Sequence, residues 1–147
     1  MRGLVMDFGG VLAGPGSGGR VLAGILTDLR RRGVRTAILS NDPGGPAGAG
    51  LRELGEGRFV DTVVLSGDVG LAKPDPRIYR LAARRLDLAP VDCVFVDDLV
   101  TNVRGAVAAG MVGVHHVDAE TTAGELGILF DLEQAGMGGH GLTWRRG

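Results

Sequence analysis

Two kinds of hydrophobic pattern alternate along the chain. Runs of consecutive apolar residues are typical of strands buried on both faces, and they lie at residues 4–6, 34–39, 62–65, 93–96 and 111–115. Segments with a helical pattern follow them, at residues 20–32, 46–54, 77–86, 101–109 and 121–133. Strands that alternate with helices in this way indicate an α/β fold. We expect a single doubly wound parallel sheet, a Rossmann-like core with helices on both faces.

The length of the chain limits the number of domains. A chain of 147 residues fits one domain with one sizeable core. No internal repeat or linker divides the pattern. We therefore predict a single core domain over residues 1–134, and we expect the glycine-rich residues 135–147 to form a flexible C-terminal tail.

Composition narrows the set of partners. The formal net charge is −1, so the overall balance favours neither nucleic acid nor an anionic membrane. The one cysteine, Cys93, excludes an internal disulfide and fits a reducing, cytoplasmic setting. No apolar stretch approaches the roughly 18 residues needed to cross a bilayer. Among 16 basic residues Lys73 is the only lysine, so its position is informative, whereas Arg30–Arg32 are expected to be a solvated last helical turn.

Polar side chains follow four of the predicted strands. They are Asp7, Ser40 with Asn41, Lys73 in the loop after the third strand, and the pair Asp97 and Asp98. Because the carboxyl ends of parallel strands meet at one edge of the sheet, these groups can converge there. The set suits phosphoryl transfer through a carboxylate nucleophile, with a hydroxyl and an ammonium binding the transferred group. Acids this close repel one another unless a cation such as Mg²⁺ holds them.

Each of these residues also has a simpler explanation. Asp7 could only end a strand, and Ser40–Pro43 could be an ordinary turn. Lys73 could be a surface residue, and Asp97-Asp98 could cap the following helix. The ordered combination of all four is more specific than any member, so it favours the catalytic interpretation.

In that order the segments resemble the haloacid dehalogenase-like (HAD) hydrolase superfamily, from residue 4 to about residue 116. Four stretches carry the resemblance: Val-Met-Asp7-Phe-Gly-Gly-Val-Leu, Ala-Ile-Leu-Ser40-Asn41, Ala-Lys73-Pro74-Asp75-Pro76 and Val-Phe-Val-Asp97-Asp98-Leu-Val-Thr-Asn102. The resemblance implies that Asp7 is the nucleophile and forms an aspartyl-phosphate. It also implies that Ser40 binds the phosphate and that Lys73 neutralises both groups.

The same resemblance implies the remaining contacts of the site. The metal ligands for Mg²⁺ would be Asp7, the backbone carbonyl of Gly9, Asp98 as the main side-chain ligand and Asp97 as an additional or more distant one. Asn102 would orient these acids. The substrate would be bound by Gly10 and Asn41 together with Ser40 and Lys73.

The sequence departs from the family pattern at two places. Gly9 stands where the family usually has a second Asp, the general acid/base for the leaving group, a role typically worth about 10²–10⁴-fold. In addition, only 33 positions separate Asp7 from Ser40, and the Gly14–Gly19 loop with one helix occupies them where relatives usually carry a cap domain. An uncapped site suggests a large substrate, a cap from another subunit of a homo-oligomer, or lost activity.

These observations favour a cytoplasmic, Mg²⁺-dependent phosphatase that acts on a small or macromolecular phosphorylated substrate, with acid catalysis weakened at Gly9. Two alternatives stay open. One is a non-catalytic binding or regulatory module on the same fold. The other is a metal-independent dehalogenase. Because halide leaves without a proton, this reaction would tolerate the missing acid at Gly9.

Overall fold

A five-stranded parallel sheet forms the centre of the protein in the computed structural model, which describes residues 1–56 and 59–132. The strands are β1 (Gly3–Met6), β2 (Arg35–Ser40), β3 (Thr62–Leu65), β4 (Cys93–Asp97) and β5 (Val112–His115). Their order is β3-β2-β1-β4-β5, and every neighbouring pair is parallel. The expected doubly wound sheet is therefore confirmed. The predicted domain end at residue 134 and the tail 135–147 lie outside the described residues.

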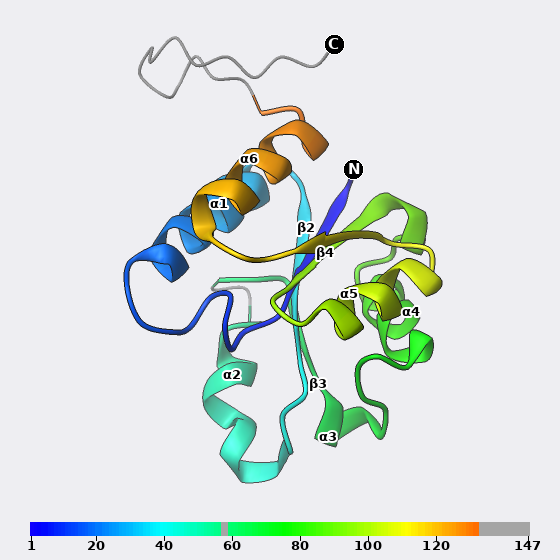
Figure 1. Ribbon diagram of the computed structural model, residues 1–147. Coiled ribbons are helices and arrows are strands. Elements are labelled where there is room, and N and C mark those ends of the chain that lie inside the picture. The colour runs from blue at the N-terminus through cyan, green and yellow to red at the C-terminus, as the bar shows by residue number, and fades with distance from the viewer. Residues whose placement is uncertain (57–58, 133–147) are drawn as a thin grey trace, which may run out of the picture.

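Helices cover both faces of this sheet (Figure 1). They are α1 (Gly18–Arg31), α2 (Ala49–Glu53), α3 (Ser66–Val69), α4 (Pro76–Arg85), α5 (Val100–Ala108) and α6 (Ala119–Leu129), with 3₁₀ turns at Gly45–Gly48 and Pro90–Asp92. Apolar side chains of α1 and α6 pack on one face, and those of α4 and α5 pack on the other. Because β1 and β4 are buried on both sides, nearly every residue in them is apolar, as their sequences indicated.

Several boundaries differ from those expected. The predicted helix 46–54 is divided into a 3₁₀ turn and the short α2, because its glycines weaken helix propagation. Helix α3 was not expected from the sequence. The last helix begins two residues before the predicted Thr121, because the Asp118 side chain accepts a hydrogen bond from the Thr121 N–H and caps it.

No domain is inserted between β1 and α1 in this part of the structure. Residues 7–17 form a tight loop in which the backbone N–H groups of Leu12 and Ala13 both donate to the Phe8 carbonyl at 2.9 Å. Gly19, expected in a loop, lies in the first turn of α1. A side chain there would collide with the Leu12 carbonyl, so glycine lets the helix pack against the loop. The carboxyl edge of the sheet thus has no cap from this segment.

Among the described residues, no helix is both long and apolar enough to span a bilayer.

Candidate active site

Lys73 forms the centre of a buried polar cluster at the carboxyl edge of the sheet. Its ammonium donates to Asp7 Oδ1, to Asp97 Oδ2 and to the Leu39 carbonyl, each at 2.9 Å. The Lys73 residue is only 5% exposed, so these charge-assisted bonds form with little competition from water. One cation therefore joins two acids that would otherwise repel each other.

Strand register explains why these three acceptors lie together. Met6 of β1 is level with Ile38 of β2 and with Val96 of β4. The next residues along the three strands are Leu39, Asp7 and Asp97, which form one row across the sheet. Side chains alternate between the faces of a sheet, so Asp7 and Asp97 both point to the face covered by α4 and α5. A single side chain from the loop before α4 can then contact both of them.

The backbone of Lys73 is held by Asn41, which follows β2. The Asn41 amide donates to the Lys73 carbonyl at 3.0 Å, and its oxygen accepts from the Lys73 N–H at 2.9 Å. The Lys73 ammonium also lies 5.5 Å from the centre of the Phe95 ring, within the range of a cation–π contact. Both contacts direct the side chain toward Asp7. The expected substrate contact of Asn41 stays a prediction, since its amide is engaged with Lys73.

Asp97 is fully buried, and both of its carboxylate oxygens have protein donors. Oδ1 accepts from the Leu99 N–H at 2.9 Å, and Oδ2 accepts from the Asn102 amide at 3.1 Å as well as from Lys73. Tyr79, which packs edge-on against Phe95, donates its hydroxyl to the Asn102 carbonyl at 2.6 Å. Asp97 is thus a fixed anion that positions Lys73. The contribution of Tyr79 was missed because no spacing in the sequence links it to the acids.

Three acids lie close enough to share one cation. Asp7, Asp97 and Asp98 each offer a carboxylate oxygen, and these oxygens lie within 4.8 Å of one another. Burial raises the pKa of Asp7 above its usual value and the nearby Asp97 adds to this, although Lys73 opposes both effects. A bound cation would offset this accumulated negative charge. An all-oxygen ligand set of this kind fits Mg²⁺.

The remaining predicted residues also lie at this edge. Ser40 is the last residue of β2 and is half-buried, directly before the Asn41 clamp. His115 ends β5, and its Nε2–H donates to the Asp98 carbonyl at 2.9 Å. This bond ties the Asp98 backbone to the neighbouring strand, a contact that the sequence pattern did not indicate.

The two glycines after Phe8 differ in what they permit. A side chain at Gly9 would meet no atom within 4 Å, and this exposed residue does not have a positive φ. Gly10 has a φ of +81°, and a side chain there would collide with the carboxylate of Asp98. The backbone therefore requires glycine at position 10 but not at position 9.

This difference provides a matched pair of variants. Gly10→Ala is expected to weaken Mg²⁺ binding by about 10- to 100-fold, because its methyl group displaces the Asp98 carboxylate. Gly9→Ala adds the same methyl group in open space and should leave Mg²⁺ affinity within about twofold. Calorimetric titration of both proteins with Mg²⁺ measures the difference. Equal affinity of the two variants would contradict the expectation that Asp98 binds Mg²⁺.

Comparison with known proteins places the chain in a family. Residues 20–110 match the family model described as haloacid dehalogenase-like hydrolase. A crystal structure of an uncharacterized protein from Corynebacterium glutamicum is 46% identical, with a TM-score of 0.86, over 90% of this chain and 97% of that one. The chain therefore belongs to the haloacid dehalogenase-like hydrolases. The matched range begins after Asp7. The placement of Asp7 in the candidate site therefore rests on its bond to Lys73 and not on the family model.

Curated relatives include phosphatases. The sesquiterpene phosphatase astK of Aspergillus oryzae is 34% identical over 106 residues, which cover 71% of this chain and 54% of that protein. Phosphoserine phosphatase of Thermus thermophilus is 37% identical over 90 residues, which cover 60% of this chain and 36% of that protein. The chain thus spans about half or less of the length of these relatives.

Proposed function

We propose that the protein is a Mg²⁺-dependent phosphatase that works through an aspartyl-phosphate on Asp7. The observation that carries the proposal is the position of Lys73, bonded to both Asp7 and Asp97 at 2.9 Å beside a third acid, Asp98. A buried lysine bonded to two carboxylates, with a third acid beside them, lies here at the edge where α/β proteins bind ligands, and such charge clusters are typical of functional sites. The phosphatase relatives support the choice of phosphate as the transferred group.

The proposed reaction begins at the Asp7 carboxylate. One Asp7 oxygen attacks phosphorus, and the bond from phosphorus to the leaving-group oxygen breaks, with its electron pair going to that oxygen. Lys73 and the Ser40 hydroxyl bind the oxygens of the transferred phosphoryl group. Water then attacks the phosphorus of the acyl phosphate, and the bond between phosphorus and the Asp7 oxygen breaks with its electron pair returning to Asp7. The protons of the water leave with the inorganic phosphate, so Asp7 is restored as a carboxylate. Mg²⁺, held by Asp7, Asp98 and the Gly9 carbonyl with Asp97 nearby, would supply charge neutralisation.

Gly9 limits which leaving groups can depart. No carboxyl group at position 9 can protonate the leaving oxygen, so the substrate must release a stable anion or bring its own proton source. The expected substrates are aryl and acyl phosphates rather than simple alkyl phosphates. A screen of these classes, with Mg²⁺ and with a chelator, tests the function. Absence of Mg²⁺-dependent phosphate release from every class would contradict it.

Restoring the acid should extend the substrate range. Gly9→Asp is expected to raise kcat/KM on alkyl phosphates by about 10²-fold, the lower end of the effect of general acid catalysis. The effect on aryl phosphates should be small, because they need no proton. The open space around position 9 accommodates the new side chain, and Gly9→Asn is the matched control without an acid. The prediction fails if Gly9→Asp and Gly9→Asn act alike on alkyl phosphates.

The open edge at Gly9 also favours a second candidate, a regulatory module that binds Mg²⁺ and phosphate without turnover. It predicts Mg²⁺ binding but no phosphate release from any class of substrate. Halide release from a 2-haloacid in the presence of a chelator would instead identify a dehalogenase.

Since no cap is inserted before α1, we further propose that a large substrate or a second copy of the chain covers the site in the cytoplasm.

A further inference from the structure

A cavity of about 650 Å³ lies at the opposite edge of the sheet, away from the acids. Among the described residues, its lining combines four arginines with a single carboxylate: Arg30, Arg31, Arg35, Arg85 and Asp61. We call this set the arginine groove. The arginines come from the end of α1, the start of β2 and the end of α4. These segments meet at the amino edge, so the groove is separate from the proposed active site.

Two of the arginines are fixed by contacts within the protein. Arg30 Nε bonds Asp61 Oδ1 at 3.0 Å. Arg35 donates from one terminal nitrogen to the carbonyls of Leu86 and Asp87, at 2.8 and 3.2 Å. These contacts join α1 to the segment before β3, and the start of β2 to the end of α4, around the groove. The walls are therefore held in place by the fold, a condition for a preformed ligand site.

The other two arginines have charge to offer a ligand. Arg31 and Arg85 are exposed, and neither takes part in the ion pairs between described residues. Asp61, the one acid among the described lining residues, is already bonded to Arg30 and to the Thr36 N–H. In a protein of net charge −1, the groove is thus a local concentration of positive charge. A helix-dipole role explains Arg30, Arg31 and Arg85, which end helices, but not the convergence of all four arginines on one cavity.

The lining also suits a mixed ligand. Val34, Phe59 and Leu86 add apolar surface next to the guanidinium groups. Guanidinium groups bind phosphate oxygens through paired hydrogen bonds, and apolar side chains bind an uncharged organic part. The geometry points to a second site, which binds a phosphorylated small molecule carrying at least two phosphate groups. A cavity of this volume holds a ligand of nucleotide size.

This site is tested by calorimetric titration of the whole protein with pyrophosphate and with adenosine triphosphate. Both titrations are made in the presence of a metal chelator. Without metal, Asp7, Asp97 and Asp98 repel anions, so binding measured in these conditions excludes the active site. We expect saturable binding that the double variant Arg31→Ala/Arg85→Ala weakens by tenfold or more. Adenosine triphosphate should bind more tightly than pyrophosphate, because it also contacts the apolar wall.

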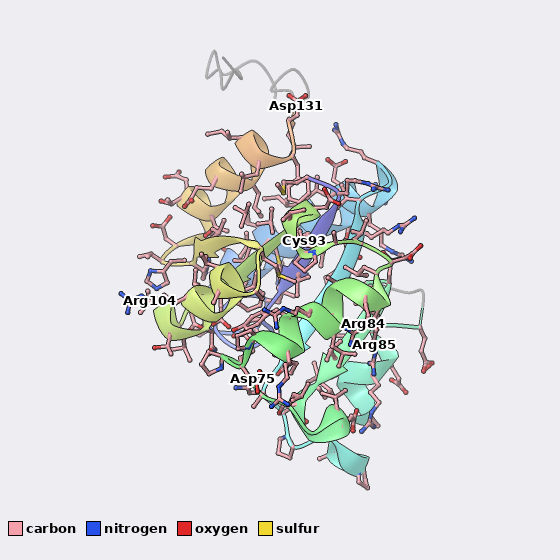
Figure 2. The ribbon with its side chains drawn as sticks, turned by 90° about the vertical axis from the view of Figure 1, so that its right-hand side faces the viewer. Asp75, Arg84, Arg85, Cys93, Arg104 and Asp131 are labelled. Atoms are coloured by element: carbon pink, nitrogen blue, oxygen red, sulfur yellow. The ribbon has the colours of Figure 1, made fainter. Side chains whose placement is uncertain are left out.

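Arg80→Ala/Arg104→Ala is the control, because it removes the same charge from exposed positions outside the groove. Figure 2 shows Arg85 and Arg104 far apart, on α4 and α5. The proposal is overturned if both double variants weaken binding equally, since the effect is then general charge attraction. Citrate that binds as tightly as pyrophosphate, or the absence of saturable binding, also overturns it. Thermal unfolding of each variant, expected to match the parent protein, confirms that exposed substitutions leave the fold intact.

Discussion

Asp7→Asn is expected to lower the turnover of an aryl phosphate by about 10⁴-fold or more, the scale of losing a covalent nucleophile. The amide oxygen of asparagine is neutral and does not form a stable bond to phosphorus. Asparagine has nearly the same shape as aspartate. The substitution removes the charge of a carboxyl group whose pKa is already raised by burial. The fold should therefore be retained. Steady-state assays with Mg²⁺ on protein purified under identical conditions measure the loss.

The control for this variant separates loss of the nucleophile from loss of the site. Asp7→Asn should keep its melting temperature within a few degrees of the parent. It should also still bind inorganic phosphate through Lys73 and Ser40. Turnover within tenfold of the parent protein would contradict the nucleophilic role of Asp7.

Lys73→Met is expected to have the largest effect on stability. Among the described residues, Lys73 is the only counter-charge bonded to both Asp7 and Asp97, and removing one partner of a buried ion pair typically costs about 3–5 kcal/mol. The methionine fills a similar volume, so the loss reflects uncompensated negative charge rather than a cavity. Chemical denaturation in the presence of a metal chelator measures this loss of unfolding free energy. Turnover should be lost as well, because the lysine ammonium no longer binds the transferred phosphoryl group.

Mg²⁺ provides an internal check on Lys73→Met. Added Mg²⁺ should recover part of the lost unfolding free energy, because the metal can neutralise the same acids. Arg80→Met, at an exposed position of α4, should change stability by no more than about 0.5 kcal/mol. If Lys73→Met is as stable as Arg80→Met in a chelator, the buried cluster does not depend on the lysine charge.

The sequence was sufficient to predict that the site would be at one edge of a parallel sheet. Polar residues follow the apolar runs, and parallel strands bring their carboxyl ends to one edge of the sheet, so the pattern predicted that Asp7, Lys73 and Asp97 would lie at the same edge. The glycine-rich helix after β2 was the least regular element in the pattern, and it is divided in the structure. Its glycines left the helical propensity too weak to fix the boundaries.

Other features depend on register and long-range packing. The row of Leu39, Asp7 and Asp97 requires the pairing of three strands, which the hydrophobic pattern does not specify. The Asn41 clamp on Lys73 joins residues 32 positions apart, and a turn residue with an amide gives no signal of such a partner. The arginine groove collects side chains from four separate segments, so each arginine by itself resembled an ordinary solvated residue.

The most direct measurement of the central claim is peptide mass spectrometry of the protein, quenched in acid during turnover of an aryl phosphate with Mg²⁺. The account predicts a mass increase of one phosphoryl group on the peptide that contains Asp7. The modification should be absent in Asp7→Asn and lost on treatment with hydroxylamine, which cleaves acyl phosphates. A turning-over enzyme with no modified peptide, or with the phosphoryl group on another residue, would contradict the account.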